Sequence, residues 1–223
     1  EGNMIKDDAI STVSENVRKA VERNHTATHL LHKALKMVLG NHVNQAGSLV
    51  LADKLRFDFN HFEAMTDAEI KEVEQIVNEE VLKAIPVNTE LMTMKEARES
   101  GAMALFDEKY GEDVRVLSIG EFSKELCGGT HVKNTGEIGL FKITQEAGIA
   151  SGVRRIEAIT GFNSISYVNK EIQNLKDIQD ALKSAKSEVL TKVKSLLQDV
   201  KTMQKQIEED RKAESLSHVD DIL

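Results

Sequence analysis

Two short segments of the sequence combine residue types that bind soft metal ions. The only cysteine, Cys127, stands four residues before His131, and the two glycines between them let the backbone turn tightly. About a hundred residues earlier, His25 and His29 are spaced i, i+4, so on a helix they project from one face. Three imidazoles and one thiolate match the tetrahedral ligation that zinc prefers. We therefore predict that His25, His29, Cys127 and His131 converge on one Zn²⁺ ion.

Other chemistry is compatible with some of these residues. A metalloprotease helix of the HExxH type needs a glutamate base between its histidines, and segment 25–29 reads HTATH, so that class is excluded. A cysteine nucleophile assisted by His131 is an alternative, although it leaves the upstream histidine pair without a role. If all four protein ligands are engaged, the zinc is structural. If one is displaced, the metal can hold a substrate or activate water.

Composition limits the class of protein. The chain has 223 residues, of which 40% are hydrophobic and 30% charged, enough for one or two domains with a buried core. No apolar run approaches the roughly 20 residues that span a bilayer, and the amino end lacks the pattern of a signal peptide. Because a lone cysteine excludes a disulfide framework, we predict a cytoplasmic protein with no membrane partner.

The charge distribution leaves a nucleic-acid partner open. A net charge of −8 argues against indiscriminate binding, which needs clustered lysine and arginine. Between Lys124 and Glu157, however, the sequence contains five basic residues and four acidic ones. This segment is compatible with a local basic lip beside the cysteine–histidine segment, and the global charge neither proves nor excludes a nucleic-acid partner.

Hydrophobic periodicity predicts the elements that position these residues. Apolar residues recur at helical spacing over 15–39, with Gly40 as the stop. A hairpin is predicted at 47–51 and 55–59, and a capping box at Thr66–Glu69 starts a helix that must end before Pro86. Further strands are predicted at 87–93, 114–119, 139–146 and 153–160, and a short helix at 95–100. Together they predict an α+β domain over 15–162, with a mixed or antiparallel sheet and helices packed around the zinc site.

The last quarter of the sequence has a different character. From Ser164 glycine and proline disappear, and apolar residues step by threes and fours through Ile207. This predicts one long, amphipathic, coiled-coil-like helix over 163–215, on the order of 65 Å in length. Its apolar stripe needs a partner, either a second helix of a hairpin or another copy of the chain in a homodimer. Residues 1–14 are interpreted as the remnant of a preceding domain and 216–223 as a tail.

Four segments in this order closely resemble the editing domain of bacterial alanyl-tRNA synthetase: NHTATHLL at 24–31, LRFDF at 55–59, CGGTH at 127–131 and SGVRRI at 151–156. The resemblance covers residues 15–162, and the following helix resembles the connector of those enzymes. It implies a zinc-dependent deacylase that removes serine or glycine from mischarged tRNA(Ala). It also implies that His25, His29, Cys127 and His131 are the ligands, and that Thr28 and Gln45 lie in the pocket that senses the amino acid.

Basic residues are the candidates for contact with the acceptor end of tRNA(Ala). Arg154 and Arg155 suit phosphate better than bases, and strand alternation sends them to opposite faces, which leaves a surface ion pair for one of them. Arg56 either lines a groove or pairs with Asp58.

The activity expected of this chain depends on what accompanies the editing segment. No stretch resembles an ATP-binding aminoacylation core, so we expect a fragment that does not charge tRNA. The alternatives are a free-standing trans-editing protein, and a structural zinc module for oligomerisation or tRNA docking.

Overall fold

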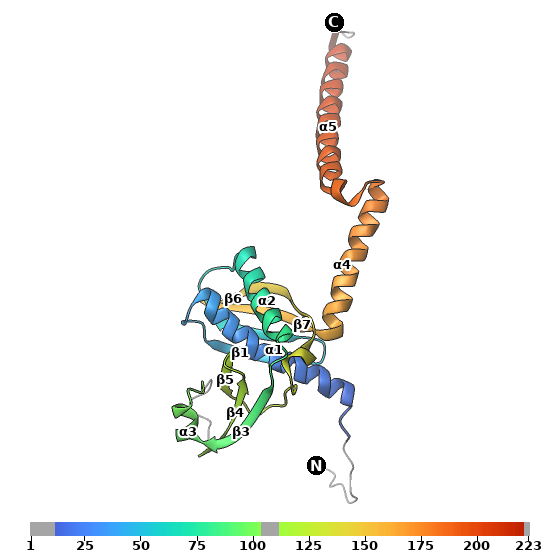
Figure 1. Cartoon of the computed structure of the whole chain (residues 1–223). Helices are drawn as coiled ribbons and strands as arrows, with labels where there is room; N and C mark the ends of the chain where they lie inside the picture. Colours follow the sequence, from blue (N-terminus) through green and yellow to red (C-terminus); the bar gives the residue numbers. More distant parts are fainter. Residues whose placement is uncertain (1–11, 104–111, 221–223) are drawn as a thin grey trace, which may run out of the picture. The chain divides into compact units, whose positions relative to one another are not determined.

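Helix α1 (Glu15–Leu39) is the element on which the domain is built. In the computed structural model, which describes residues 12–103 and 112–220, Leu30, Leu31 and Leu35 of α1 are fully buried. The helix ends where predicted, because Gly40 has φ +113, a value that residues with a side chain rarely adopt, and donates its N–H to the carbonyl of Lys36. Figure 1 shows α1 and α2 lying together beside the strands of the domain.

A four-stranded antiparallel sheet packs against this helix, in the order β1-β2-β7-β6. The strands span Gln45–Val50 (β1), Leu55–Asn60 (β2), Phe141–Ala150 (β6) and Val153–Thr160 (β7). On β2 the apolar residues Leu55, Phe57 and Phe59 are fully buried, as period-two alternation predicts. Helix α1 contacts β2 and β7, and α2 (Asp67–Leu82) contacts β6.

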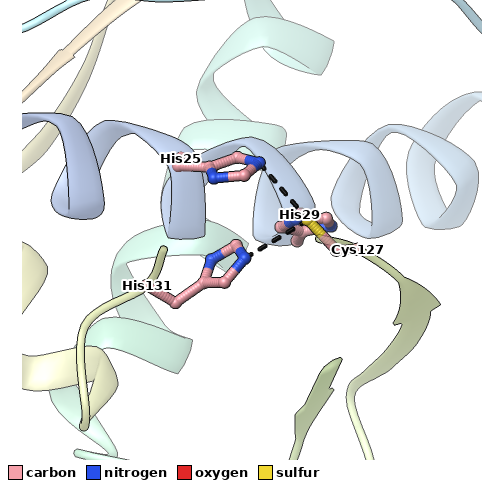
Figure 2. Close-up of side chains that lie close together, drawn as sticks. All are labelled: His25, His29, Cys127 and His131. Atoms are coloured by element: carbon pink, nitrogen blue, oxygen red, sulfur yellow. Dashed lines mark hydrogen bonds between the residues drawn. The ribbon is translucent and has the colours of Figure 1, made fainter. Parts of the chain in front are cut away.

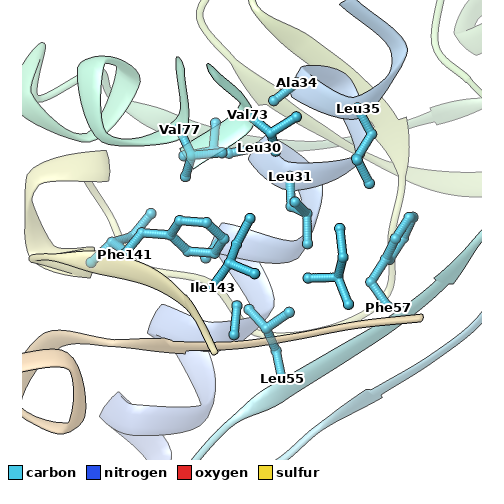
Figure 3. Close-up of a cluster of buried hydrophobic side chains, with 14 of the residues drawn as sticks. Leu30, Leu31, Ala34, Leu35, Leu55, Phe57, Val73, Val77, Phe141 and Ile143 are labelled. Carbon is cyan, nitrogen blue, oxygen red and sulfur yellow. The ribbon is translucent and has the colours of Figure 1, made fainter. Parts of the chain in front are cut away.

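The main core lies between these helices and the sheet. Figure 3 shows leucines of α1 meeting Val73 and Val77 of α2, with Leu55, Phe57, Phe141 and Ile143 from the strands. The predicted capping box starts α2: Glu69 N–H donates to Thr66 Oγ1, and the Glu69 carboxylate accepts from Thr66 N–H. Beyond the helix, Ala84 has φ +52, and the chain continues through Pro86 into a second sheet.

The second sheet is separate and three-stranded, where one sheet was expected. Strands β3 (Val87–Thr93), β4 (Asp113–Ile119) and β5 (Ser123–Leu126) are antiparallel in sequence order. The short helix α3 (Met94–Glu99) packs beside it, and Ala97, Val114, Val116 and Leu126 form a cluster of their own. Short 3₁₀ helices lie at Thr135–Ile138 and Lys186–Glu188 in the described parts of the chain. The cysteine–histidine segment directly follows β5.

The structure corrects the prediction of one continuous helix over 163–215. There are two helices, α4 (Gly161–Leu182) and α5 (Val189–Asp220). Helix α4 ends because Lys183 adopts φ +48, so that its N–H and that of Ser184 turn back to the carbonyls of Asp180 and Gln179. The apolar spacing continues across this break through Leu182, Ala185 and Val189, which is why periodicity did not reveal it.

Two compact units divide between Ser166 and Tyr167. The predictions for residues 1–11, 104–111 and 221–223 lie outside the described parts of the chain. Within those parts, none of the helices is both long and apolar enough to cross a membrane.

Candidate metal centre

The four predicted ligands do converge. His25 and His29 come from α1, and Cys127 and His131 from the segment after β5; Figure 2 shows their side chains pointing toward one another. The candidate ligand atoms all lie within 4.8 Å of one another. Cys127 Sγ is 3.5 Å from His25 Nε2 and 3.3 Å from His131 Nε2.

This donor set fits a zinc ion. With metal bonds of about 2.3 Å to sulfur and 2.0–2.1 Å to nitrogen, the sulfur–nitrogen edge of a tetrahedron is about 3.5 Å, close to the two distances above. His29 Nε2 is buried and has no hydrogen-bond partner among the described residues, an arrangement that is costly unless the atom has another ligand. The residue types, the distances between their ligand atoms and the unpaired Nε2 atom of His29 therefore agree with a metal centre.

Hydrogen bonds on the far side of the rings orient two of the imidazoles. His25 Nδ1 lies 3.2 Å from the carbonyl oxygen of Thr130, which can only accept. His131 Nδ1 lies 3.3 Å from Thr26 Oγ1, whose own proton is donated to a carbonyl of α1. Each ring therefore carries its proton on Nδ1 and directs the lone pair of Nε2 toward the centre.

The backbone of the cysteine–histidine loop is tied to β4. Arg115 Nη1 donates to the carbonyl of Gly129, and Cys127 N–H donates to the carbonyl of Arg115 at 3.0 Å. A Cβ on Gly129 would lie 2.1 Å from His25 Cε1, so the close approach of the histidine ring requires glycine at this position. Arg115 was not anticipated from the sequence, since nothing in the alternation of β4 distinguishes it from a surface arginine.

The electrostatics favour the ligand forms of the thiol and of His131. Burial alone would raise the pKa of Cys127, but its interactions with His131, His25 and His29 outweigh it and lower the pKa to about 3. Burial and the neighbouring histidines lower the pKa of His131 to about 4. At neutral pH the cluster therefore holds a thiolate and a neutral imidazole, the protonation states that bind a metal.

His29 behaves in the opposite way. Burial would lower its pKa, but the interactions of the ring with Cys127 and Glu125 raise it to about 9. The Glu125 carboxyl is buried, which disfavours its charge, yet His29 and His32 hold its pKa well below the usual range. Glu125 was also missed from the sequence, because no strand was predicted at 123–126 and the contact with His29 depends on the fold.

The two predicted pocket residues lie on α1 and β1. Thr28 precedes His29, is 5% exposed, and donates its hydroxyl to the carbonyl of Asn24 at 2.9 Å. Gln45 begins β1 and donates to Ser48 Oγ at 2.9 Å. Neither hydrogen bond joins these side chains to His25, His29, Cys127 or His131, so the role of Thr28 and Gln45 in a pocket stays a prediction.

The three predicted arginines differ in how they are engaged. Arg154 makes two hydrogen bonds to the Glu146 carboxylate, at 2.6 and 2.7 Å, and Arg155 makes two to Asp58, at 2.7 and 2.8 Å. Both are thus in ion pairs, where one was expected. Arg56 approaches Asp58 only to 3.7 Å, and its buried Nε has no hydrogen-bond partner among the described residues.

Comparison with known families finds a match to the part of the chain that contains the cysteine–histidine loop. Residues 114–157, which run from β4 through the cysteine–histidine loop to β7, match the family described as the threonyl and alanyl tRNA synthetase second additional domain. The match thus contains Cys127 and His131, while His25 and His29 lie upstream of it.

Whole-chain similarity is to alanine–tRNA ligases. The chain is 55% identical to that of Fervidobacterium nodosum over 89% of its own length, and 53% identical to that of Acetivibrio thermocellus over 96%. It is 51% identical to the enzyme of Pseudoalteromonas translucida over 91%. These matches confirm the resemblance to alanyl-tRNA synthetase drawn from the four motifs. The chain spans about a quarter of the length of these relatives, 23%, 24% and 23% respectively.

Proposed function

We propose that this domain binds Zn²⁺ through His25, His29, Cys127 and His131 and hydrolyses the ester of tRNA(Ala) mischarged with serine or glycine. The observation that carries the proposal is the convergence of three imidazoles and one thiolate in a chain similar to alanine–tRNA ligases. A zinc ion there polarises a carbonyl or lowers the pKa of a bound water. Such a second site is needed because a binding pocket discriminates poorly between similar small amino acids.

Thr28 is proposed to recognise the wrong amino acid. Because its hydroxyl proton is donated to Asn24 O, the oxygen is left as an acceptor. A serine hydroxyl can donate to that oxygen, whereas the methyl group of alanine cannot. A hydrogen bond of this kind contributes about 0.5–1.5 kcal/mol, which corresponds to roughly 2- to 13-fold in favour of serine. Gln45 is proposed to line the same pocket.

Arg56 is the strongest candidate for contact with tRNA phosphate. Arg154 and Arg155 each spend two donors on a carboxylate, while Arg56 makes only a long contact to an aspartate that Arg155 already holds. On the sheet face shared by Arg56 and Arg155, the side chains Lys54, Arg56 and Arg155 exceed the carboxylates Asp58 and Glu157 by one positive charge. An excess cation at the surface suits the phosphate backbone.

Deacylation assays test this function directly. The chain is incubated with Ser-tRNA(Ala), Gly-tRNA(Ala) and Ala-tRNA(Ala), and release of the amino acid is measured. We expect serine and glycine to be released faster than alanine, Cys127→Ala to abolish release, and Thr28→Val to reduce it for serine. Thr89→Val, at an exposed position on β3, is the matched control. Absence of serine release from the wild-type chain would contradict the proposal.

A structural zinc module is the second candidate, favoured by one observation. Four protein ligands complete a tetrahedron and leave no open position, as in structural zinc sites. This candidate predicts about one bound zinc per chain, no release of serine, and loss of folding on chelation. The assay above separates the two candidates.

Self-association of the C-terminal helices is also a proposal. Leu190, Leu197 and Met203 of α5 are 59–65% exposed in the single chain, and an apolar stripe of this kind favours a helical partner. Sedimentation equilibrium of the whole chain tests it: a monomer at all concentrations would refute the homodimer.

A further inference from the structure

We propose that Glu125 is a positioning residue of the metal centre, and that it acts by fixing the ring of His29; this rests on the proposed zinc site. The Glu125 side chain is 1% exposed, and its Oε2 lies 2.7 Å from His29 Nδ1. The other oxygen, Oε1, accepts from Ser123 Oγ at 3.0 Å and lies 3.5 Å from His32 Nδ1. None of these three partners of Glu125 belongs to the segment 127–131.

Glu125 fixes the tautomer of the His29 ring. A carboxylate can only accept, so the hydrogen bond at 2.7 Å places a proton on His29 Nδ1. In the neutral ring this leaves the lone pair on Nε2, the buried atom that has no hydrogen-bond partner among the described residues. Without Glu125 either nitrogen can carry the proton, and the ring is free to rotate about its side-chain bonds. Glu125 therefore selects both the ligand atom and its direction.

The carboxylate of Glu125 is itself immobilised. Ser123 and Glu125 are two residues apart on β5, so both side chains point to the same face of the strand, toward α1. On α1, His32 stands one turn beyond His29 and contacts Phe57 in a tilted arrangement, with ring centroids 5.4 Å apart. With Ser123 on one oxygen and His32 near it, the carboxylate is held on one side and presents its second oxygen to His29.

This arrangement has a cost. A buried carboxylate loses its hydration, and replacing buried ionic groups by apolar residues of similar size is often neutral or stabilising. On β4 the residue paired with Glu125 is Leu117, which is buried in the main apolar core, so an apolar residue at position 125 would suit folding. A costly acid that contacts a proposed ligand at 2.7 Å is explained by the metal centre that it orients.

Metal affinity is the decisive measurement. Zinc affinity of the whole chain is measured by competition with a chelator of known affinity, and Co²⁺ is used as a spectroscopic substitute. We expect Glu125→Gln to weaken zinc binding roughly 10- to 100-fold and to shift the ligand-field bands of the Co²⁺ form. Glu80→Gln is the matched control, since Glu80 is also buried but pairs with Lys83. It should leave both readings unchanged.

Two results would overturn the proposal. The first is a Glu125→Gln protein with wild-type zinc affinity and an unchanged Co²⁺ spectrum. The second applies if Glu125→Gln does not fold: Ser123→Ala, which frees Oε1 but keeps the bond to His29, is expected to weaken zinc binding severalfold, and wild-type affinity in that variant would refute the role. A wild-type chain that binds no zinc would instead refute the proposed site.

Discussion

Gly129→Ala is the sharpest test of the geometry of the metal centre. The added Cβ would stand 2.1 Å from His25 Cε1 and 2.6 Å from His25 Nδ1, distances at which something must move. The neighbouring position is a natural control, because a Cβ on Gly128 meets nothing within 4 Å. Gly128 also lacks a positive φ, so alanine introduces no backbone strain there. The two variants carry the same substitution at adjacent positions, and only Gly129→Ala introduces a collision.

The collision should weaken zinc binding more than folding. In the metal-free protein the His25 ring can rotate away, since its hydrogen bond to Thr130 O lies at an exposed site. Binding zinc requires the ring to return, against an overpacking cost of about 1–3 kcal/mol. Because each 1.4 kcal/mol is a factor of ten, zinc affinity should fall roughly 5- to 150-fold in Gly129→Ala and stay within about twofold in Gly128→Ala.

Chelator competition gives the affinities, and thermal unfolding of the metal-free variants shows that both fold. Equal zinc affinity in the two variants would refute the placement of His25 against the loop. A large loss of metal-free stability in Gly129→Ala alone would show that the close approach matters to folding and not only to the metal.

Four further outcomes follow from the structure. Leu31→Ala, at a fully buried position, should lower the free energy of unfolding by about 2–5 kcal/mol, measured by urea titration. Thr66→Ala removes the cap of α2 and should cost about 1 kcal/mol in the same titration. Because the pKa of His29 in the metal-free protein is raised to about 9, the ring must lose a proton when zinc binds. Zinc affinity should therefore rise by roughly tenfold per pH unit between pH 6.5 and 8.5, below that pKa. A flat profile of affinity against pH would contradict a protonated His29. Removing zinc should speed amide exchange in 126–132 and leave β2 protected; equal protection in both forms would contradict a metal that holds the loop.

The elements of the fold follow closely from local pattern. The spacing of apolar residues on α1, the glycine at position 40 and the capping box at Thr66 each act within a few residues, and each is found where predicted. The break after α4 is different. Lys183 adopts a left-handed conformation that glycine would have announced, and the apolar repeat runs past it without interruption. A helix end formed by a residue other than glycine or proline leaves no mark in the composition of the sequence or in the spacing of its apolar residues.

The proposed metal ligands could be predicted from residue type, whereas the residues that support them could not. Histidine and cysteine are residue types that bind metals, and their spacing (two histidines at i, i+4, and a cysteine four residues before a histidine) is visible in the sequence. Arg115 and Glu125 acquire their roles only through contacts across the fold, with Gly129 and His29 respectively. On a strand, an arginine or glutamate is typical of a solvent-facing position, and only the folded structure shows that Glu125 is buried and that Arg115 contacts the loop. Partnership of this kind depends on which strands meet, and single-sequence patterns do not determine that.

The position of the ligands gives the proposed metal a mechanical role beside its chemical one. His25 and His29 stand on α1, whose leucines belong to the main core, while Cys127 and His131 follow the strand that ends the three-stranded sheet. A metal held by all four would therefore join the helix to the loop that follows the second sheet, beside the hydrogen bonds that His25 and Thr26 already make with this loop. Loss of one ligand from α1 and loss of one from the loop should then have the same consequence, release of this loop from the helix. The metal would add to a contact that already exists, because Leu117 and Ile119 of the second sheet share the main core with the leucines of α1.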